Sequence, residues 1–199
     1  MTKKPNTATS DKQAAKKAVV KRAQAVPSVE ALPNLDEEGL VRAIIETPKH
    51  SRNKYKYEPE TGMFECAQAL QGGLTFPIDF GFVPSTRAED GDPLDVMILM
   101  DEPAFAGCLV HAKIIGVLEA QQTQEARTFR NDRLLGVHNK SVEYGEYESW
   151  HDVPKAVLKE LELFFIMHNK TKGKVFEVIG WKGAAVAMQT LNKTRTNPK

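Results

Sequence analysis

Cysteine, net charge and long apolar runs are all scarce in this sequence, and each scarcity excludes a class of protein. Two cysteines in 199 residues, Cys66 and Cys108, cannot build a disulfide-rich scaffold and lack the spacing of a zinc site. A net charge of +1 produces no global field that would select nucleic acid. No apolar run reaches the roughly 18 residues of a membrane span, and no secretory segment is recognised. We therefore expect a cytoplasmic protein that binds neither membrane nor nucleic acid, with both thiols reduced and buried.

What the sequence does contain is a dense acidic turn at residues 89–96, Glu-Asp-Gly-Asp-Pro-Leu-Asp-Val. Gly and Pro favour a turn, and the apolar residues 96–100 that follow have the length of a buried strand. Three like charges on one turn repel one another unless water solvates them or a cation collects them. Oxygen ligands on a turn suit Mg²⁺, Mn²⁺ or Ca²⁺ better than zinc, although the spacing is not that of an EF-hand. The candidate ligands are Asp90, Asp92 and Asp95.

The first 37 residues differ in composition from the rest. Seven Lys or Arg side chains oppose one acid before Glu30, and the apolar residues are mostly Ala and Val. Such a segment buries too little apolar surface to offset the entropy of ordering. We expect a flexible basic tail over 1–37, in which 12–24 has the pattern of a short helix. One folded domain is expected over 38–192 and a short C-terminal tail over 193–199.

Short alternating or apolar runs, separated by Gly and Pro turns, predict several strands in the folded part. Gly116 predicts a bulge in one of them, and the polar residues 121–130 predict a loop. Helical spacing predicts a helix from Val153 to about His168, capped by Asp152, and a second helix over 184–191. This order of elements indicates a mainly β, α+β fold, a small closed β-barrel with helices outside. The expected strands lie at 40–46, 51–58, 63–66, 96–100, 109–118, 134–137 and 175–180.

Several motifs occur in a distinctive order along the chain. They are Glu46 shortly before Pro48, Lys54-Tyr55, Phe76-Pro77, Phe80-Gly81-Phe82, the acidic turn, Gly116-Val117 and Gly180-Trp181. Over about residues 40–191 this order resembles that of the soluble family I inorganic pyrophosphatases, and D-G-D-P-x-D-V is the most specific of these motifs. The resemblance implies a five-stranded OB-like closed barrel with flanking helices. It also implies a homo-oligomeric enzyme that hydrolyses inorganic diphosphate to two phosphates, mostly with Mg²⁺.

The resemblance also implies a role for each acid. Asp90 and Asp95 would bind metal, with Asp95 bridging two ions. Asp92 would bind metal and act as the base that takes a proton from the attacking water. Glu46 would orient water from behind the metal ligands, and Lys54 would hold a phosphate by its point charge.

Other positions depart from the family pattern. Lys56 stands where the family has an acid, while Gln68 and Phe80 replace a phosphate-binding arginine and a proton-donating tyrosine. Two aspartates of the tightest metal site fall at Gln122 and Asn131. The loss of two carboxylates is expected to weaken that site, which leaves Mn²⁺ or another divalent ion open as the cofactor.

Four more residues complete the predicted site. Asp132, next to the altered position 131, is the candidate substitute metal ligand. Arg133 keeps the charge of a family lysine and is assigned to catalysis and substrate binding. Lys56 is expected to replace a cation if it points inward, and Lys170 is preferred as the phosphate-binding cation after the long helix.

Three functions remain open at this point. The first is metal-dependent hydrolysis of diphosphate. The second is hydrolysis of an organic diphosphate or nucleotide on the same scaffold. The third is a non-catalytic module that binds phosphate or nucleic acid, against which the three intact aspartates argue, because only a bound cation would favour holding them together.

Overall fold

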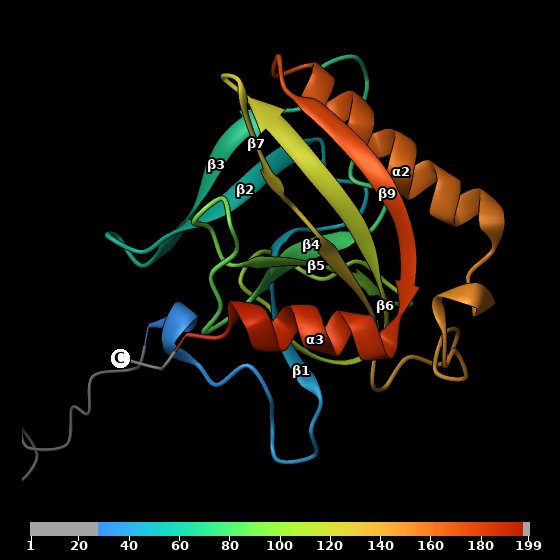
Figure 1. The fold of residues 1–199 in the computed structure, drawn as a ribbon. Helices are drawn as coiled ribbons and strands as arrows, with labels where there is room; N and C mark the ends of the chain where they lie inside the picture. Colours follow the sequence, from blue (N-terminus) through green and yellow to red (C-terminus); the bar gives the residue numbers. More distant parts are fainter. Residues whose placement is uncertain (1–27, 197–199) are drawn as a thin grey trace, which may run out of the picture.

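Strands are the main regular structure in residues 28–196, the part of the chain that the computed structural model describes (Figure 1). The expected mainly β architecture with outer helices is confirmed. The strands are β1 (Val41–Thr47), β2 (Asn53–Glu58), β3 (Met63–Ala69), β4 (Asp79–Val83), β5 (Leu94–Leu99), β6 (Leu109–Gln124), β7 (Arg127–Arg130), β8 (Arg133–His138) and β9 (Val175–Gly183). The helices are α2 (Lys155–Lys170) and α3 (Ala184–Thr194), with 3₁₀ turns η1 (Val29–Ala31) and η2 (Trp150–Asp152).

The long strand β6 organises the larger sheet. It spans 16 residues and pairs with β1, β7, β8 and β9. Following the pairings from β1 through β4, β5, β8 and β6 leads back to β1. All of these pairs are antiparallel except β5 with β8, and β2 pairs with β3 in a separate two-stranded sheet. The predicted bulge is confirmed, because the register of β6 on β8 shifts between Ile114 and Gly116.

Two local predictions are wrong. Residues 121–130 do not form a loop: β6 continues to Gln124 and turns into β7 through Glu125 and Ala126, which both have positive φ. Polar residues thus form an exposed hairpin here, which hydrophobic periodicity does not reveal. Asp152 caps η2 rather than α2, because its carboxylate accepts hydrogen bonds from the backbone N–H groups of Glu148 and Ser149.

The folded region is wider than the sequence indicated. Asp36, assigned to the flexible tail, accepts from the N–H of Leu40 and pairs with the ring of His111. At the other end, α3 runs to Thr194, and the N–H of Thr196 donates to Ser85 O. Residues 28–37 and 193–196 therefore pack against the sheet. The predicted helix at 12–24 lies outside the described residues.

Two apolar clusters hold the helices against the sheet. The buried face of α2 bears Leu158, Leu161, Phe164 and Phe165, as its spacing predicted. Helix α3 covers another part of the sheet with Ala187 and Leu191. Among the described residues no helix is long and apolar enough to cross a bilayer. The expectation that both thiols are buried is wrong, because Cys66 is exposed and Cys108 is only partly buried.

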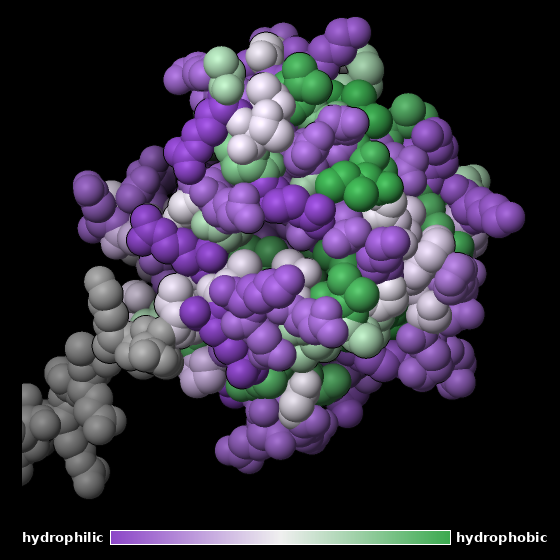
Figure 2. Space-filling model, in the orientation of Figure 1, coloured by the Kyte–Doolittle hydropathy of each residue, from purple (hydrophilic) through white to green (hydrophobic). Residues whose placement is uncertain are grey.

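The face seen in Figure 2 is mostly hydrophilic, with separate apolar patches between charged residues. Val175 and Ile179 of β9 and Leu163 and Met167 of α2 are exposed apolar side chains. Apolar residues scattered in this way are ordinary on a protein surface, so they identify no interface by themselves.

Gly81 lies where two strands approach too closely for a side chain. A Cβ at this position would lie 1.8 Å from Ile44 O on β1. We expect Gly81→Ala to lower the free energy of unfolding by about 3 kcal/mol, measured by urea denaturation. Gly183→Ala is the control, because a Cβ there meets nothing within 4 Å. Equal losses in the two variants would contradict this interpretation.

Candidate active site

The acidic turn joins β4 to β5 and is closed by its own hydrogen bonds. Thr86 Oγ1 accepts from the N–H of Leu94 (2.8 Å), and the N–H of Ala88 donates to Asp92 O (2.8 Å). The N–H of Asp92 donates to Asp90 Oδ1 (3.1 Å), and Gly91 adopts a φ of 90° that favours glycine. Local chemistry therefore sets the shape of the turn and presents its carboxylates at the start of β5.

A polar cavity of about 120 Å³ lies beside this turn. It collects side chains from β2, the acidic turn, the ends of β6 and β8, and the C-terminal end of α2. Five predicted site residues line it: Lys54, Asp90, Asp92, Asp95 and Arg133. Phe80, Gln122 and Asn131, which the resemblance set apart from the family pattern, also line it. So do His168 and Asn169, the alternative position for the family's Tyr-Lys pair, and Lys172 and Lys174, which the sequence analysis did not suggest.

Each of the three aspartates meets a donor from elsewhere in the chain. Lys56 Nζ lies 3.1 Å from Asp92 Oδ1, and an Arg133 guanidinium nitrogen lies 3.3 Å from Asp95 Oδ2. The side-chain amide of Asn131 donates to Asp90 Oδ2 at 3.5 Å, a long contact, and to Gln122 Oε1 at 3.1 Å. The side-chain amides of Gln122 and Asn131 therefore lie in the cavity wall as hydrogen-bonding groups.

Arg133 is a buried cation whose charge is stabilised by a carboxylate, two aromatic rings and a backbone oxygen. The parallel pairing of β5 with β8 places it opposite Asp95. Its guanidinium carbon lies 4.3 Å from the ring centre of Phe165 and 4.4 Å from that of Phe176. It also donates to the backbone oxygen of Asn131 at 2.9 Å. This arrangement fixes a positive charge at the floor of the cavity.

Burial dominates the electrostatics of the acids. It raises the pKa of Asp95 to about 6, although Arg133 and Lys54 act in the opposite direction. Burial also raises the pKa of Asp90 and, to about 7, that of Glu46. Glu46 Oε1 accepts from the N–H of Tyr57 (2.8 Å), which holds the carboxyl in place. Carboxylates whose charge is costly to bury are stabilised by an added cation.

Comparison with known proteins decides the family. The profile of the family described as inorganic pyrophosphatase matches residues 43–199. This chain belongs to the inorganic pyrophosphatase family. The predicted family, and with it the predicted enzyme class of a diphosphatase, are confirmed.

Individual relatives agree with the family match. The inorganic pyrophosphatase of Synechocystis sp. is 33% identical over 168 residues, 84% of this chain and 97% of the relative. That of Methanosarcina acetivorans is 32% identical over 82% of this chain and 95% of its own length. The crystal structure of inorganic pyrophosphatase from Thermus thermophilus superimposes with a TM-score of 0.77 at 32% identity, covering 84% of this chain and 96% of that one.

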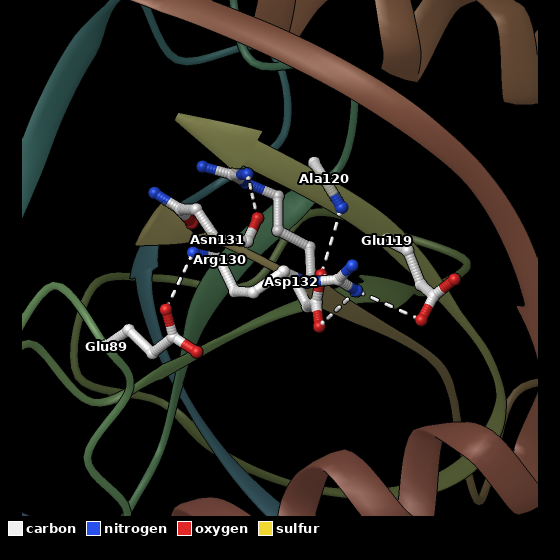
Figure 3. Close-up of polar contacts among 7 residues, drawn as sticks. Glu89, Glu119, Ala120, Arg130, Asn131 and Asp132 are labelled. Atoms are coloured by element: carbon white, nitrogen blue, oxygen red, sulfur yellow. Dashed lines mark hydrogen bonds and ion pairs between the residues drawn. The ribbon is translucent and has the colours of Figure 1, made fainter. Parts of the chain in front are cut away.

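Asp132, the predicted substitute ligand, lies between β7 and β8 with its side chain turned away from this cavity. Its carboxylate accepts from the N–H of Ala120 (3.0 Å) and pairs with Arg130, which also pairs with Glu119 (Figure 3). These side chains line a second cavity, of about 430 Å³, beside α3. Side chains alternate along an extended chain, so Asn131 facing the first cavity turns Asp132 away from it.

Lys170 is likewise outside the cavity. It is exposed at the last residue of α2, whereas Lys172 and Lys174 reach the cavity wall. Helix α2 ends two residues later than the spacing predicted, which moves the lining cations further along the chain. Gln68 lies opposite Lys54 on β3 and is not a lining residue.

The chemistry of the lining side chains fits a hard divalent ion, but they are not gathered around one point. In residues 28–196 no three His, Cys, Asp or Glu side chains form a group that could hold an ion. Three carboxylates nevertheless share one cavity, and burial makes an added cation favourable there. Asp90, Asp92 and Asp95 are the side chains that could hold the ion.

Within residues 28–196, His168 has no hydrogen-bond partner for either ring nitrogen, although it is only 5% exposed. Its ring stacks on Phe164, with centroids 5.6 Å apart and planes 5° apart. Burial, followed by the positive charge of Lys172, lowers its pKa to about 3. The unfolded chain takes up a proton below the ordinary value of 6.5, so this group lowers stability as the pH falls from 6.5 toward 3.

We expect His168→Phe to keep the ring stack and to raise the free energy of unfolding by about 1 kcal/mol at neutral pH. The gain should grow between pH 6.5 and pH 5, because the variant lacks the group that protonates on unfolding. Urea denaturation at several pH values measures both effects. His151→Phe is the control, since His151 is exposed and stacks on Trp150. A gain that does not change with pH would contradict the assignment of a neutral buried imidazole.

Proposed function

We propose that this diphosphatase acts through a divalent ion held by Asp90, Asp92 and Asp95, with Mg²⁺ as the first candidate and Mn²⁺ as the second. The supporting observation is that three carboxylates and the cations of Lys54 and Arg133 line one small cavity. Acids alone would repel diphosphate, and cations alone would not activate water. Both kinds of group together suit an anionic substrate bound with a metal.

The bound ion would supply positive charge that acidifies water and neutralises phosphoryl oxygens. Asp92, at the exposed end of the turn, accepts the proton of the attacking water as its oxygen bonds to phosphorus. The bridging P–O bond breaks in the same displacement, and the second phosphate leaves. Glu46, held by the N–H of Tyr57, orients water behind the ligands. Lys54 and Arg133 stabilise the negative charge of the phosphoryl groups.

The size and polarity of the cavity favour diphosphate over the alternatives. About 120 Å³ of polar space suits a small anion better than a nucleotide. An organic diphosphate would have to extend out of the cavity. A module that only binds phosphate would gain nothing from three carboxylates that repel its ligand.

The wider architecture is proposed with the function. The ring of pairings from β1 back to β1 supports the closed five-stranded OB-like barrel that the family resemblance implies. The packing of residues 28–37 and 193–196 supports one domain over about residues 28–196. A cytoplasmic location, expected from the composition, and a homo-oligomeric state, which the resemblance implies, complete the proposal.

Asp92→Asn should lower kcat for diphosphate at least about 100-fold, because the amide cannot accept a proton. Phosphate release is measured with Mg²⁺, Mn²⁺ and Zn²⁺ in turn. Glu89→Gln, on the same turn but outside the cavity, should stay within about twofold of wild type. Wild-type turnover without any divalent ion, or full activity of Asp92→Asn, would refute the mechanism.

The neighbouring lysines test which cation binds substrate. Burial and nearby positive charges lower the pKa of Lys172 to about 8, so its ammonium is lost above that pH. Lys172→Ala should raise KM for diphosphate about tenfold and remove a rise in KM above pH 8. Lys170→Ala should change KM by less than about twofold, because its side chain is exposed outside the cavity. A larger effect of Lys170→Ala would restore the assignment made from the sequence.

A further inference from the structure

Lys56 links the two-stranded sheet to the acidic turn through an ion pair. It lies on β2, in the two-stranded sheet, and its ammonium reaches the acidic turn 36 residues further along the chain. Lys54, two positions earlier on the same face of the strand, lines the cavity. Lys56 thus stands at the mouth of the cavity with its charge against the proposed base, Asp92.

The donors of the three aspartates differ in how easily they can leave. Arg133 is buried between two aromatic rings and cannot withdraw without stranding its charge. Asn131 is buried and is also held by Gln122. The side chain of Lys56 is 51% exposed, and in the described residues its one side-chain hydrogen bond is to Asp92. Lys56 is therefore the donor that water can replace at little cost.

We propose that Lys56 is a resident counter-ion of Asp92 that a divalent ion must displace, and that the released ammonium then faces the diphosphate. Only the second claim, that the released ammonium faces diphosphate, rests on the proposed function. An ammonium and a divalent ion repel each other strongly on one carboxylate, so the two occupy Asp92 in turn. Metal binding then adds a mobile cation beside Lys54, and bound diphosphate favours the exchanged state in return.

The exchange can be measured without turnover, by titrating Mn²⁺ alone into the full chain and following free Mn²⁺ by electron paramagnetic resonance. Lys56→Met keeps the length of the side chain but removes the competing charge. We expect it to bind Mn²⁺ about two- to fivefold more tightly than wild type, the range that follows from an exposed ion pair. Lys56→Arg keeps the charge and should bind Mn²⁺ as wild type does.

Lys113→Met is a matched control, because Lys113 forms an exposed ion pair with Glu148 (2.7 Å) away from the cavity. It should leave the Mn²⁺ affinity unchanged. At saturating Mn²⁺, Lys56→Met should raise KM for diphosphate severalfold with a smaller change in kcat. Circular dichroism confirms that each variant folds.

The possible results distinguish the exchange at Asp92 from the proposed diphosphatase function. Unchanged or weaker Mn²⁺ binding by folded Lys56→Met would overturn the counter-ion role, whatever the activity. Tighter Mn²⁺ binding with an unchanged KM would leave Lys56 as a counter-ion of Asp92 and overturn its contact with diphosphate. If wild type shows the exchange but hydrolyses no diphosphate with any divalent ion, the proposed function fails and the exchange stands.

Discussion

Arg133 and Asp95 form the pair of charges around which this structure is arranged. The parallel register of β5 and β8 brings the two residues together, and the rings of Phe165 and Phe176 enclose the guanidinium. One ring comes from α2 and the other from β9, so this cation lies where the helix packs on the sheet. A buried charge without its partner is strongly destabilising. The same pair therefore links the packing of the core to the chemistry of the cavity.

The negative charge of the acids around this pair is only partly compensated by nearby cations. Burial raises the pKa of Asp90, Asp95 and Glu46, while Arg133, Lys54 and Lys56 compensate them only in part. Such a site is costly for the empty protein and favourable for a cation that arrives with an anionic substrate. Gln122 and Asn131 contribute amides rather than carboxylates to the cavity wall, and Arg133 and Lys56 bring positive charge to its acids. Part of the positive charge that balances these acids is thus built into the polypeptide.

The sequence predicted the features that depend on short stretches of chain. The acidic turn, the apolar face of α2 and the bulge at Gly116 each follow from a few neighbouring residues. It did not predict which face Asp132 would occupy, because a single step in register reverses a side chain. The limits of the folded region also escaped prediction, since the anchoring of Asp36 depends on a histidine 75 residues away. Lys172 was missed because two further residues of helix decide which lysine reaches the cavity.

The segment 130–133 separates two compartments with a single thickness of backbone. Asn131 and Arg133 face the small polar cavity, while Arg130 and Asp132 face the larger one beside α3. Neighbouring residues of one extended segment thus line both cavities. A displacement of Arg130 or Asp132 at the cavity beside α3 is consequently passed along the backbone to Asn131 and Arg133 in the smaller one.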